Sequence, residues 1–170
     1  AGAGALTIPL ARAGARVIAI ECDPVWVRRL TQRVARLGLE GEVRVRAGDL
    51  RDVDLPAQPF RVVSSPPFHL TTTVLRRLLD DPARGPYRVD LVVQWEVARK
   101  RAELPPRSLL STAWAPWWEF ELVRRIPRGA FRPTPGVDAA WLAIRKRRQP
   151  LLPPSLARDY AEFVRSRWPL

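Results

Sequence analysis

Four consecutive residues, Ser65-Pro66-Pro67-Phe68, follow an apolar strand that the sequence predicts over Phe60–Val63. Each proline lacks an N–H and fixes φ, so the turn is rigid and its carbonyls stay free to accept hydrogen bonds. Free acceptors beside an aromatic ring at the end of a strand could hold a flat base that bears an exocyclic amine. The alternative is a proline-rich loop that only closes a strand, and the tetrapeptide alone does not separate the two.

A glycine-rich turn, Ala1-Gly2-Ala3-Gly4, precedes a helix predicted over Leu6–Ala13. Glycines let a backbone approach a ligand closely, and a helix N-terminus favours anionic or polar groups. A buried strand over Arg16–Glu21 follows and ends in a carboxylate, at the place where Glu21 could accept both hydroxyls of a ribose. The alternative role for Glu21 is a helix N-terminal charge ahead of Asp23-Pro24.

A second acid, Asp49, comes just past the next predicted strand. Asp23 as N-cap and Pro24 at the first position predict a helix to about Leu37, stopped by Gly38. The alternation over Glu42–Ala47 predicts the strand, so Asp49 falls at the same carboxyl edge as Glu21. It could accept a hydrogen bond from an adenine amino group, or it could be a simple turn residue.

The later chain alternates helices and strands, with no internal repeat. Two late strands are expected to form an antiparallel pair joined by the loop Pro127–Asp138. Arg99, Lys100 and Arg101 could contact phosphate, although a solvated helical face is the commoner meaning of such a run. Four tryptophans are expected in packing roles: Trp114, Trp117, Trp118 and Trp141. The predicted helices are 71–79, 97–103, 108–115 and 155–168, and the predicted strands are 89–96, 117–126 and 139–144.

The charge of the chain points to nucleic acid. Of the 170 residues, 29 are Lys or Arg and 17 are Asp or Glu, a net charge of +12, and the only lysines are Lys100 and Lys146. Arginine forks match phosphate bidentately and stack on bases, which favours RNA in particular. A GC-rich genome would explain arginine over lysine, but it would not explain the excess over acid.

Composition also excludes several classes of protein. A single cysteine, Cys22, and a single histidine, His69, leave no internal disulfide and no metal-ligand cluster, and we assign neither a chemical role. No apolar run approaches the ~20 residues that span a bilayer, and no signal peptide is visible. We therefore expect a cytoplasmic monomer with no metal and no membrane partner.

Taken together, the motifs resemble the Erm-type 23S rRNA adenine-N6 methyltransferases of macrolide resistance, which are kin to the small-subunit rRNA dimethyladenosine transferases. Six motifs occur in the family's order over nearly the whole chain. They are Ala1-Gly2-Ala3-Gly4-Ala5-Leu6-Thr7, Glu21, Gly48-Asp49, Pro66-Pro67-Phe68, Gln94-Trp95-Glu96-Val97-Ala98 and Phe131-Arg132-Pro133-Thr134-Pro135 through Val137-Asp138.

The resemblance implies an α/β, doubly wound, Rossmann-like methyltransferase fold that uses S-adenosylmethionine and acts on an adenine N6 in the peptidyl-transferase loop of 23S rRNA. Its cofactor-binding residues would be Gly2 and Gly4 against the amino-acid part, Glu21 on the ribose, Asp49 on the adenine amine, and Ser64. Its catalytic residues would be Ser65, Pro66 and Phe68, which hold the target base, with Phe68 stacking on it. The loop from Phe131 to Asp138 would lie beside the target pocket.

The sequence departs from the family pattern in three ways. Ser65 stands where the family has Asn. The chain has no methionine and no strand before Gly2, so the resemblance predicts a truncated chain whose first strand is missing. At the other end, only the linker and first helix of a C-terminal RNA-binding helical region are expected, over 150–170, after a catalytic domain over 1–149.

Three rival functions follow from the same residues. The first is a small-subunit rRNA dimethyltransferase, and the second is a DNA adenine methyltransferase, for which no separate target-recognition region is visible. The third is a catalytically impaired rRNA-binding remnant or assembly factor, which is motivated by Ser65 and by the missing strand.

Overall fold

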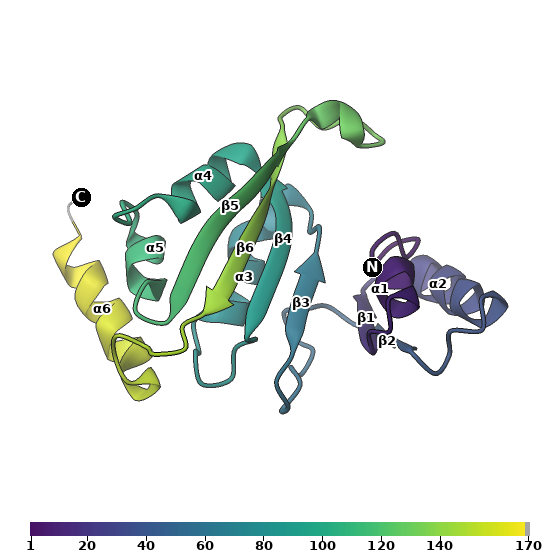
Figure 1. The fold of residues 1–170 in the computed structure, drawn as a ribbon, viewed down its shortest axis with the longest axis horizontal. Coiled ribbons are helices and arrows are strands. Elements are labelled where there is room, and N and C mark those ends of the chain that lie inside the picture. Colours follow the sequence, from purple (N-terminus) through teal and green to yellow (C-terminus); the bar gives the residue numbers. More distant parts are fainter. Residues whose placement is uncertain (169–170) are drawn as a thin grey trace. The chain divides into compact units, whose positions relative to one another are not determined.

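The computed structural model describes residues 1–168, which divide into two compact units (Figure 1). The first unit is Ala1–Asp54 and the second begins at Leu55. The first contains α1 (Thr7–Arg12), β1 (Val17–Glu21), α2 (Pro24–Arg36) and β2 (Val43–Ala47). The second contains β3 (Arg61–Ser64), η1 (Phe68–Leu70), α3 (Thr71–Leu79), β4 (Arg88–Gln94), α4 (Trp95–Ala102), α5 (Leu109–Trp114), β5 (Trp118–Ile126), η2 (Arg128–Ala130), β6 (Ala139–Lys146), η3 (Pro154–Leu156) and α6 (Ala157–Arg167).

In the first unit, β1 and β2 pair in parallel, with Val17 opposite Val43 and Glu21 opposite Ala47. Helices α1 and α2 supply the other half of a small core, whose buried members are Ile8, Ala11, Ala19, Leu30, Val34 and Val43. The expected start of α2 is confirmed, because the Asp23 side chain accepts a hydrogen bond from the backbone N–H of Val25. The expected stop is confirmed as well: Gly38 follows the helix with φ +63°.

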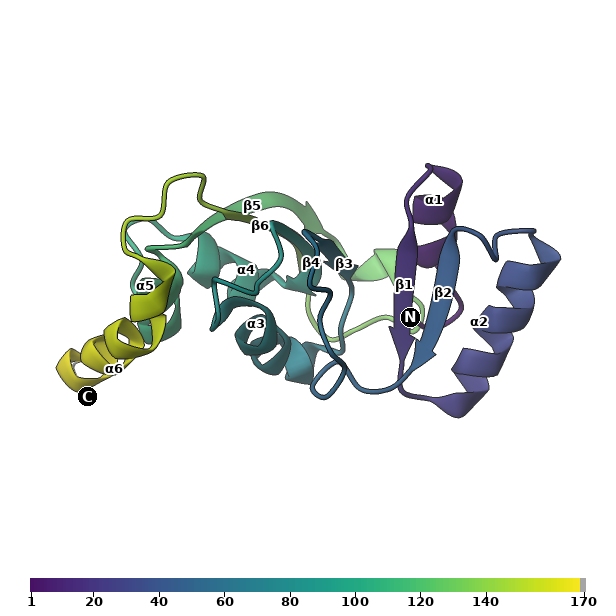
Figure 2. The same ribbon diagram turned by 90° about the horizontal axis from the view of Figure 1, so that it is seen from below.

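In the second unit, four strands form one sheet in the order β3-β4-β6-β5. Strands β3 and β4 are parallel, whereas β6 runs antiparallel to both β4 and β5, as expected for the two late strands. Helices α3 and α4 lie on the same face of this sheet (Figure 2). On that face the indole N–H of Trp118 donates to the carbonyl of Leu79 on α3 (3.1 Å), and Trp114 of α5 stacks on Phe120 of β5.

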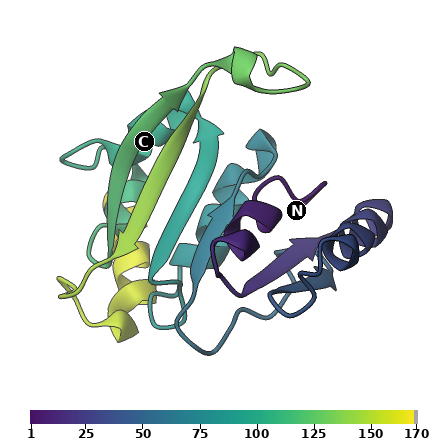
Figure 3. The same cartoon turned by 45° about the vertical axis from the view of Figure 1, so that its right-hand side comes forward.

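The hairpin of β5 and β6 continues beyond the rest of the sheet into the η2 loop (Figure 3). Trp114, Trp117 and Trp118 are buried at its other end, which confirms their packing roles, and Trp141 on β6 is half-buried.

Two expectations about strands need correction. The strand expected over Val89–Glu96 ends at Gln94, and Trp95 and Glu96 form the first turn of α4. The strand ends before the predicted limit because Trp95 has helical conformation and its N–H donates to the carbonyl of Asp138 in the β5–β6 loop (2.9 Å). The strand β1 is also not buried throughout: Ala19 is buried, but Ile18 is 48% exposed because α1 and α2 cover one face of the β1–β2 sheet.

The expected sheet is therefore present as two groups of strands, β1-β2 and β3-β4-β6-β5. Within residues 1–168, no strand corresponds to the first strand that the resemblance implies. The predicted division into 1–149 and 150–170 stays a prediction.

Gly4 offers a test of the first unit's packing. A Cβ at Gly4 would lie 2.7 Å from Cδ1 of Leu30 and 3.2 Å from Cγ1 of Ile8, whereas a Cβ at Gly14 would meet nothing within 4 Å. The two glycines have nearly the same φ, +83° and +86°, so backbone strain is matched. We expect Gly4→Ala to lower the free energy of unfolding by about 1–3 kcal/mol more than Gly14→Ala, because it overpacks the core. Equal losses in urea titrations would contradict this packing.

Candidate functional site

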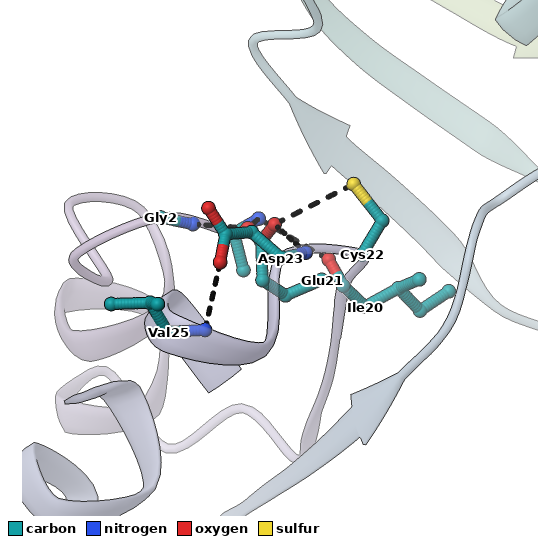
Figure 4. A network of polar contacts seen from close by, with 7 residues as sticks. Gly2, Ile20, Glu21, Cys22, Asp23 and Val25 are labelled. Carbon is teal, nitrogen blue, oxygen red and sulfur yellow. Dashed lines mark hydrogen bonds and ion pairs between the residues drawn. The ribbon is translucent and has the colours of Figure 1, made fainter. Parts of the chain in front are cut away.

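At the carboxyl edge of the first unit's sheet, Glu21 is surrounded by hydrogen-bond donors (Figure 4). Its Oε2 accepts from the N-terminal ammonium of Ala1 (2.5 Å) and from the backbone N–H of Gly2 (2.7 Å). Its Oε1 accepts from the N–H of Asp23 (3.0 Å) and, more weakly, from the thiol of Cys22 (3.7 Å). The carboxylate therefore holds the glycine-rich turn against the start of α2.

These donors favour the ionised carboxylate. Partial burial alone would raise the pKa of Glu21, but the hydrogen bonds from Gly2, the N-terminal ammonium and Asp23 outweigh it and lower the pKa from 4.5 to about 2. The contact with Asp23 supports the alternative role, a charge at the N-terminus of α2. Ribose binding by Glu21 stays a prediction, and it would require hydroxyls to take over some of these acceptor positions.

The two glycines of the turn differ in their surroundings. Gly4 is buried, and its Cα faces Leu30 and Ile8, so its lack of a side chain is explained by packing. Gly2 has φ +55° and open space where a Cβ would point. Of the two predicted cofactor-binding glycines, only Gly2 presents an open face to a ligand.

Asp49 lies one residue past the same edge, where Gly48 N–H donates to the carbonyl of Glu21 (2.9 Å). Its carboxylate accepts from the backbone N–H of Arg51 (2.8 Å) and pairs with the Arg51 guanidinium (2.6 Å). The guanidinium is the main cause that lowers the pKa of Asp49 to about 2. This geometry is that of the alternative, a turn residue, and an adenine contact at Asp49 stays a prediction.

In the second unit, the turn Ser65–Phe68 follows β3 as expected. Ser64 is the last strand residue and pairs with Leu91. Ser65 is exposed and Pro66 is buried, and within residues 1–168 neither the Ser65 hydroxyl nor the Pro66 carbonyl has a hydrogen-bond partner. A main-chain acceptor without a partner at a buried residue is uncommon. Within the described residues, the hydrogen-bonding capacity of both atoms is therefore unused.

Phe68 is half-buried and begins the short helix η1. Thr71 fixes that helix, because its hydroxyl donates to the Phe68 carbonyl (2.9 Å). Within the described residues, the Phe68 ring stacks on no other aromatic ring. Stacking of Phe68 on a target base stays a prediction.

Two further motifs meet at this edge. The N–H of Trp95, just after β4, donates to the carbonyl of Asp138, just before β6 (2.9 Å). Arg125 of β5 pairs with the Asp138 carboxylate (2.7 Å) and lies 4.9 Å from the centre of the Trp95 ring. The N–H of Arg128 also donates to Asp138 (3.0 Å). The loop that the resemblance placed beside the target pocket is thus tied to the end of β4.

The sequence reasoning missed Asp90, which lies inside the most apolar strand. It is 5% exposed, and it accepts hydrogen bonds from Arg88 on its own strand, from Arg61 on β3 (2.9 Å) and from the Trp141 indole on β6 (2.9 Å). Burial raises its pKa, but these donors lower it overall. A single acid within a run of Val and Leu was the available signal, because buried charges are almost always paired.

The basic run on α4 makes mostly internal contacts. Arg99 pairs with Glu96 on its own helix, and Arg101 donates to the hydroxyls of Ser108 and Ser111 at the start of α5 (2.7 and 3.1 Å). Lys100 is exposed. Of these three side chains, only that of Lys100 fits the phosphate contact that the sequence suggested.

Two classes of site receive no support from residues 1–168. No group of three or more His, Cys, Asp or Glu side chains in this part of the chain could hold a metal ion. None of its helices is both long enough and apolar enough to cross a membrane.

The predicted site residues therefore fall into two sets. Gly2, Gly4, Glu21 and Asp49 lie in the first unit, where the glycine turn and both acids gather at the end of β1 and β2. Ser64, Ser65, Pro66 and Phe68 lie in the second unit, at the edge that also carries Trp95 and the β5–β6 loop.

Comparison with known proteins gives one family over nearly the whole chain. The model of the ribosomal RNA adenine dimethylase family matches residues 1–167. An rRNA adenine N-6-methyltransferase of Corynebacterium diphtheriae is 41% identical over 89% of the chain, and the mycinamicin-resistance protein MyrB of Micromonospora griseorubida is 44% identical over 97%. The chain spans 58% and 51% of the length of these two relatives.

Solved structures agree with the expected fold. The crystal structure of the 23S rRNA methyltransferase ErmE superposes with a TM-score of 0.82 at 30% identity, covering 96% of this chain and 66% of that one. A dimethyladenosine transferase from Plasmodium falciparum superposes with a TM-score of 0.74 at 19% identity, covering 85% of this chain and 53% of that one. The doubly wound, Rossmann-like methyltransferase fold is thereby confirmed.

The lowered pKa of Glu21 predicts a pH dependence of stability. Because the folded pKa of about 2 lies below the ordinary 4.5, the ionised carboxylate stabilises the fold above about pH 4.5, and this contribution is lost as the pH falls towards 2. Urea unfolding of the parent and Glu21→Gln should therefore differ at pH 7 and converge near pH 2. Glu40→Gln, which removes an exposed charge outside the network, is the control. A Glu21→Gln difference that is constant with pH would contradict the assignment.

Proposed function

We infer that this chain, which belongs to the ribosomal RNA adenine dimethylase family, is the catalytic part of an Erm-type 23S rRNA adenine-N6 methyltransferase. The observation that carries the proposal is the turn Ser65–Phe68, whose free acceptors adjoin an aromatic ring at a strand end. The likeness to the 23S rRNA methyltransferase ErmE over 96% of the chain supports the same activity. Its cellular consequence would be macrolide resistance, and MyrB, a mycinamicin-resistance protein, is among its relatives.

S-adenosylmethionine fits the first unit. The open face of Gly2 leaves room beside the glycine turn, and ribose hydroxyls would take over some of the acceptor positions that internal donors occupy on the ionised Glu21. In this proposal Gly2 and Glu21 hold the cofactor, with Asp49 as a further contact in the same unit. The cofactor supplies an electrophilic methyl group on a sulfonium centre.

The second unit would prepare the nucleophile. The lone pair of an adenine N6 is delocalised into the ring and attacks poorly. The Pro66 carbonyl and the Ser65 hydroxyl can each accept one N6 hydrogen, which shifts the nitrogen towards sp³ and localises the lone pair. Phe68 stacks on the base and fixes its plane, so that most of the catalysis comes from positioning and electrostatics. The target base must leave its stack, which costs a few kcal/mol and is cheapest in a loop.

We further propose that the protein acts as a cytoplasmic monomer on 23S rRNA. The main rival is a small-subunit rRNA dimethyltransferase, which shares the family and the fold. An RNA-binding remnant without activity is the non-enzymatic rival, and it rests on Ser65 in place of Asn. All three predict RNA binding, so product analysis is needed to separate them.

Methyl transfer tests the proposal. Labelled methyl from S-adenosylmethionine is offered with protein-free 23S and 16S rRNA, and the modified base is mapped. We expect N6-methyladenine in the peptidyl-transferase loop of 23S rRNA, and we expect Glu21→Ala to abolish cofactor binding. Label in 16S rRNA would favour the dimethyltransferase. RNA binding without transfer would favour the remnant.

Ser65 is tested by restoring the family's residue. A hydroxyl is shorter than a carboxamide and can also donate to N6, which would occupy the lone pair, so we expect Ser65 to give slow transfer with mainly monomethyl product. Ser65→Asn should raise turnover and the ratio of dimethyl to monomethyl adenine, as measured by mass spectrometry of digested RNA. Unchanged turnover and product ratio would show that this interpretation is wrong.

A further inference from the structure

Helix α2 carries a concentration of positive charge that the proposed function does not use. Its 13 residues include Arg28, Arg29, Arg33 and Arg36 and no acid, and all four arginines are exposed. Trp26, Arg29, Arg33 and Arg36 are spaced i, i+3, i+7 and i+10, so they lie along one side of the helix. We call these four residues the α2 stripe.

The stripe is not compensated by carboxylates. Within residues 1–168, no ion pair involves any residue of α2. By contrast, surface arginines of the second unit such as Arg76, Arg107 and Arg145 each pair with a carboxylate. Like charges three and four residues apart destabilise a helix by a few tenths of a kcal/mol each. Arg33 and Arg36 in the last turn do favour the helix dipole, but four arginines without an acid are more than that role requires.

Two of the guanidinium groups, those of Arg29 and Arg33, are nevertheless held in place. Arg29 lies 5.1 Å from the centre of the Trp26 ring, and Nη1 of Arg33 donates to the carbonyl of Ala3 (2.7 Å). Together with Gln32, Arg36 and Ala3, these side chains line an open hollow of about 310 Å³. Oriented arginines on a surface lose less side-chain entropy when they bind, because part of it has already been lost.

We propose that the α2 stripe, which belongs to a different unit from the turn Ser65–Phe68, binds the phosphodiester backbone of the RNA substrate. The proposal rests on the proposed function for the identity of the polyanion. From Arg29 to Arg36 the helix rises about 10 Å, a length along which one strand of a duplex carries about three phosphates. Arginine is the side chain whose fork matches phosphate oxygens. The Trp26 ring among these arginines is half-buried, and an aromatic face can also stack on a base.

The test is the salt dependence of RNA binding by the full chain. Arg29→Gln/Arg33→Gln/Arg36→Gln removes three positive charges and keeps good helix formers. Affinity for a 23S rRNA fragment is measured by fluorescence anisotropy between 50 and 200 mM salt. Each lost phosphate contact lowers the slope of log K against log salt by about 0.7–0.9, so we expect a total fall of about 2 to 3. The ratio of the parent's affinity to that of the glutamine variant should then fall roughly 20- to 40-fold as the salt is raised from 50 to 200 mM.

Two variants control for charge and for structure. Arg76→Gln/Arg107→Gln/Arg145→Gln removes the same charge from arginines that are paired with carboxylates, and its slope should change by less than about 1. Arg29→Lys/Arg33→Lys/Arg36→Lys keeps the charge, so it should keep most of the slope. Thermal unfolding of the variants is measured alongside, because the glutamine variant also loses the hydrogen bond of Arg33 to Ala3 and the contact of Arg29 with Trp26, and its RNA binding is compared at a temperature where it is folded.

The proposal is overturned if the glutamine variant keeps the parent's slope, if the paired-arginine control loses as much, or if the parent shows no salt-dependent RNA binding. A variant that keeps its RNA slope but loses binding to anionic vesicles would assign the stripe to a membrane instead and would also overturn it. Methyl transfer is assayed separately. RNA binding through the stripe without transfer would reject the proposed activity and leave the stripe intact.

Discussion

Parallel pairing of strands is the constraint on which the arrangement of this molecule depends. Two parallel strands cannot be joined by a tight turn, so each is followed by a helix that returns the chain to the same starting edge. Whatever follows the strands therefore collects at the opposite edge, where ligands bind in doubly wound sheets. In the first unit this gathers Glu21 and Asp49 after β1 and β2. In the second it gathers Ser65 and Trp95 after β3 and β4, and the antiparallel β6 begins at the same edge, with Ala139 opposite Gln94.

At each of these edges, one carboxylate accepts hydrogen bonds from several groups. Glu21 joins the glycine turn, the end of β1 and the start of α2. Asp138 joins Trp95 to Arg125 and Arg128 through its main chain and side chain. A third acid, Asp90, ties β3 to β4 and β6 from within the sheet, and so fixes the strand that carries the target turn. Each of these acids therefore ties separate segments of the chain together.

Local signals in the sequence were enough for much of the fold. The N-cap Asp23, Pro24 and Gly38 define α2 because their effects act within a few residues. The end of β4 was misplaced because Trp95 suits a strand by propensity, whereas its contact with Asp138, over 40 residues away, holds it in α4. The exposure of Ile18 depends on which face of a sheet the helices cover, and no local pattern reports that.

The candidate site could be located from the sequence, but its contacts could not. Motif order placed Glu21, Asp49 and the Ser65–Phe68 turn at strand ends, where the structure has them. The donors around Glu21 and the pairing of Asp49 with Arg51 depend on side-chain geometry that spacing does not contain. The role of Gly4 also became clear only from its neighbours: it makes room for Leu30 in the core, while Gly2 faces open space.

The thiol of Cys22 is a natural site for chemical labelling beside Glu21. It is the single cysteine of the chain, it is exposed, and its sulfur lies 3.7 Å from Oε1 of Glu21. A fluorophore or spin label would therefore attach at one known position beside the carboxylate, without any engineering of the sequence. Its emission or mobility would report events at the end of β1 directly, independently of RNA and of catalysis.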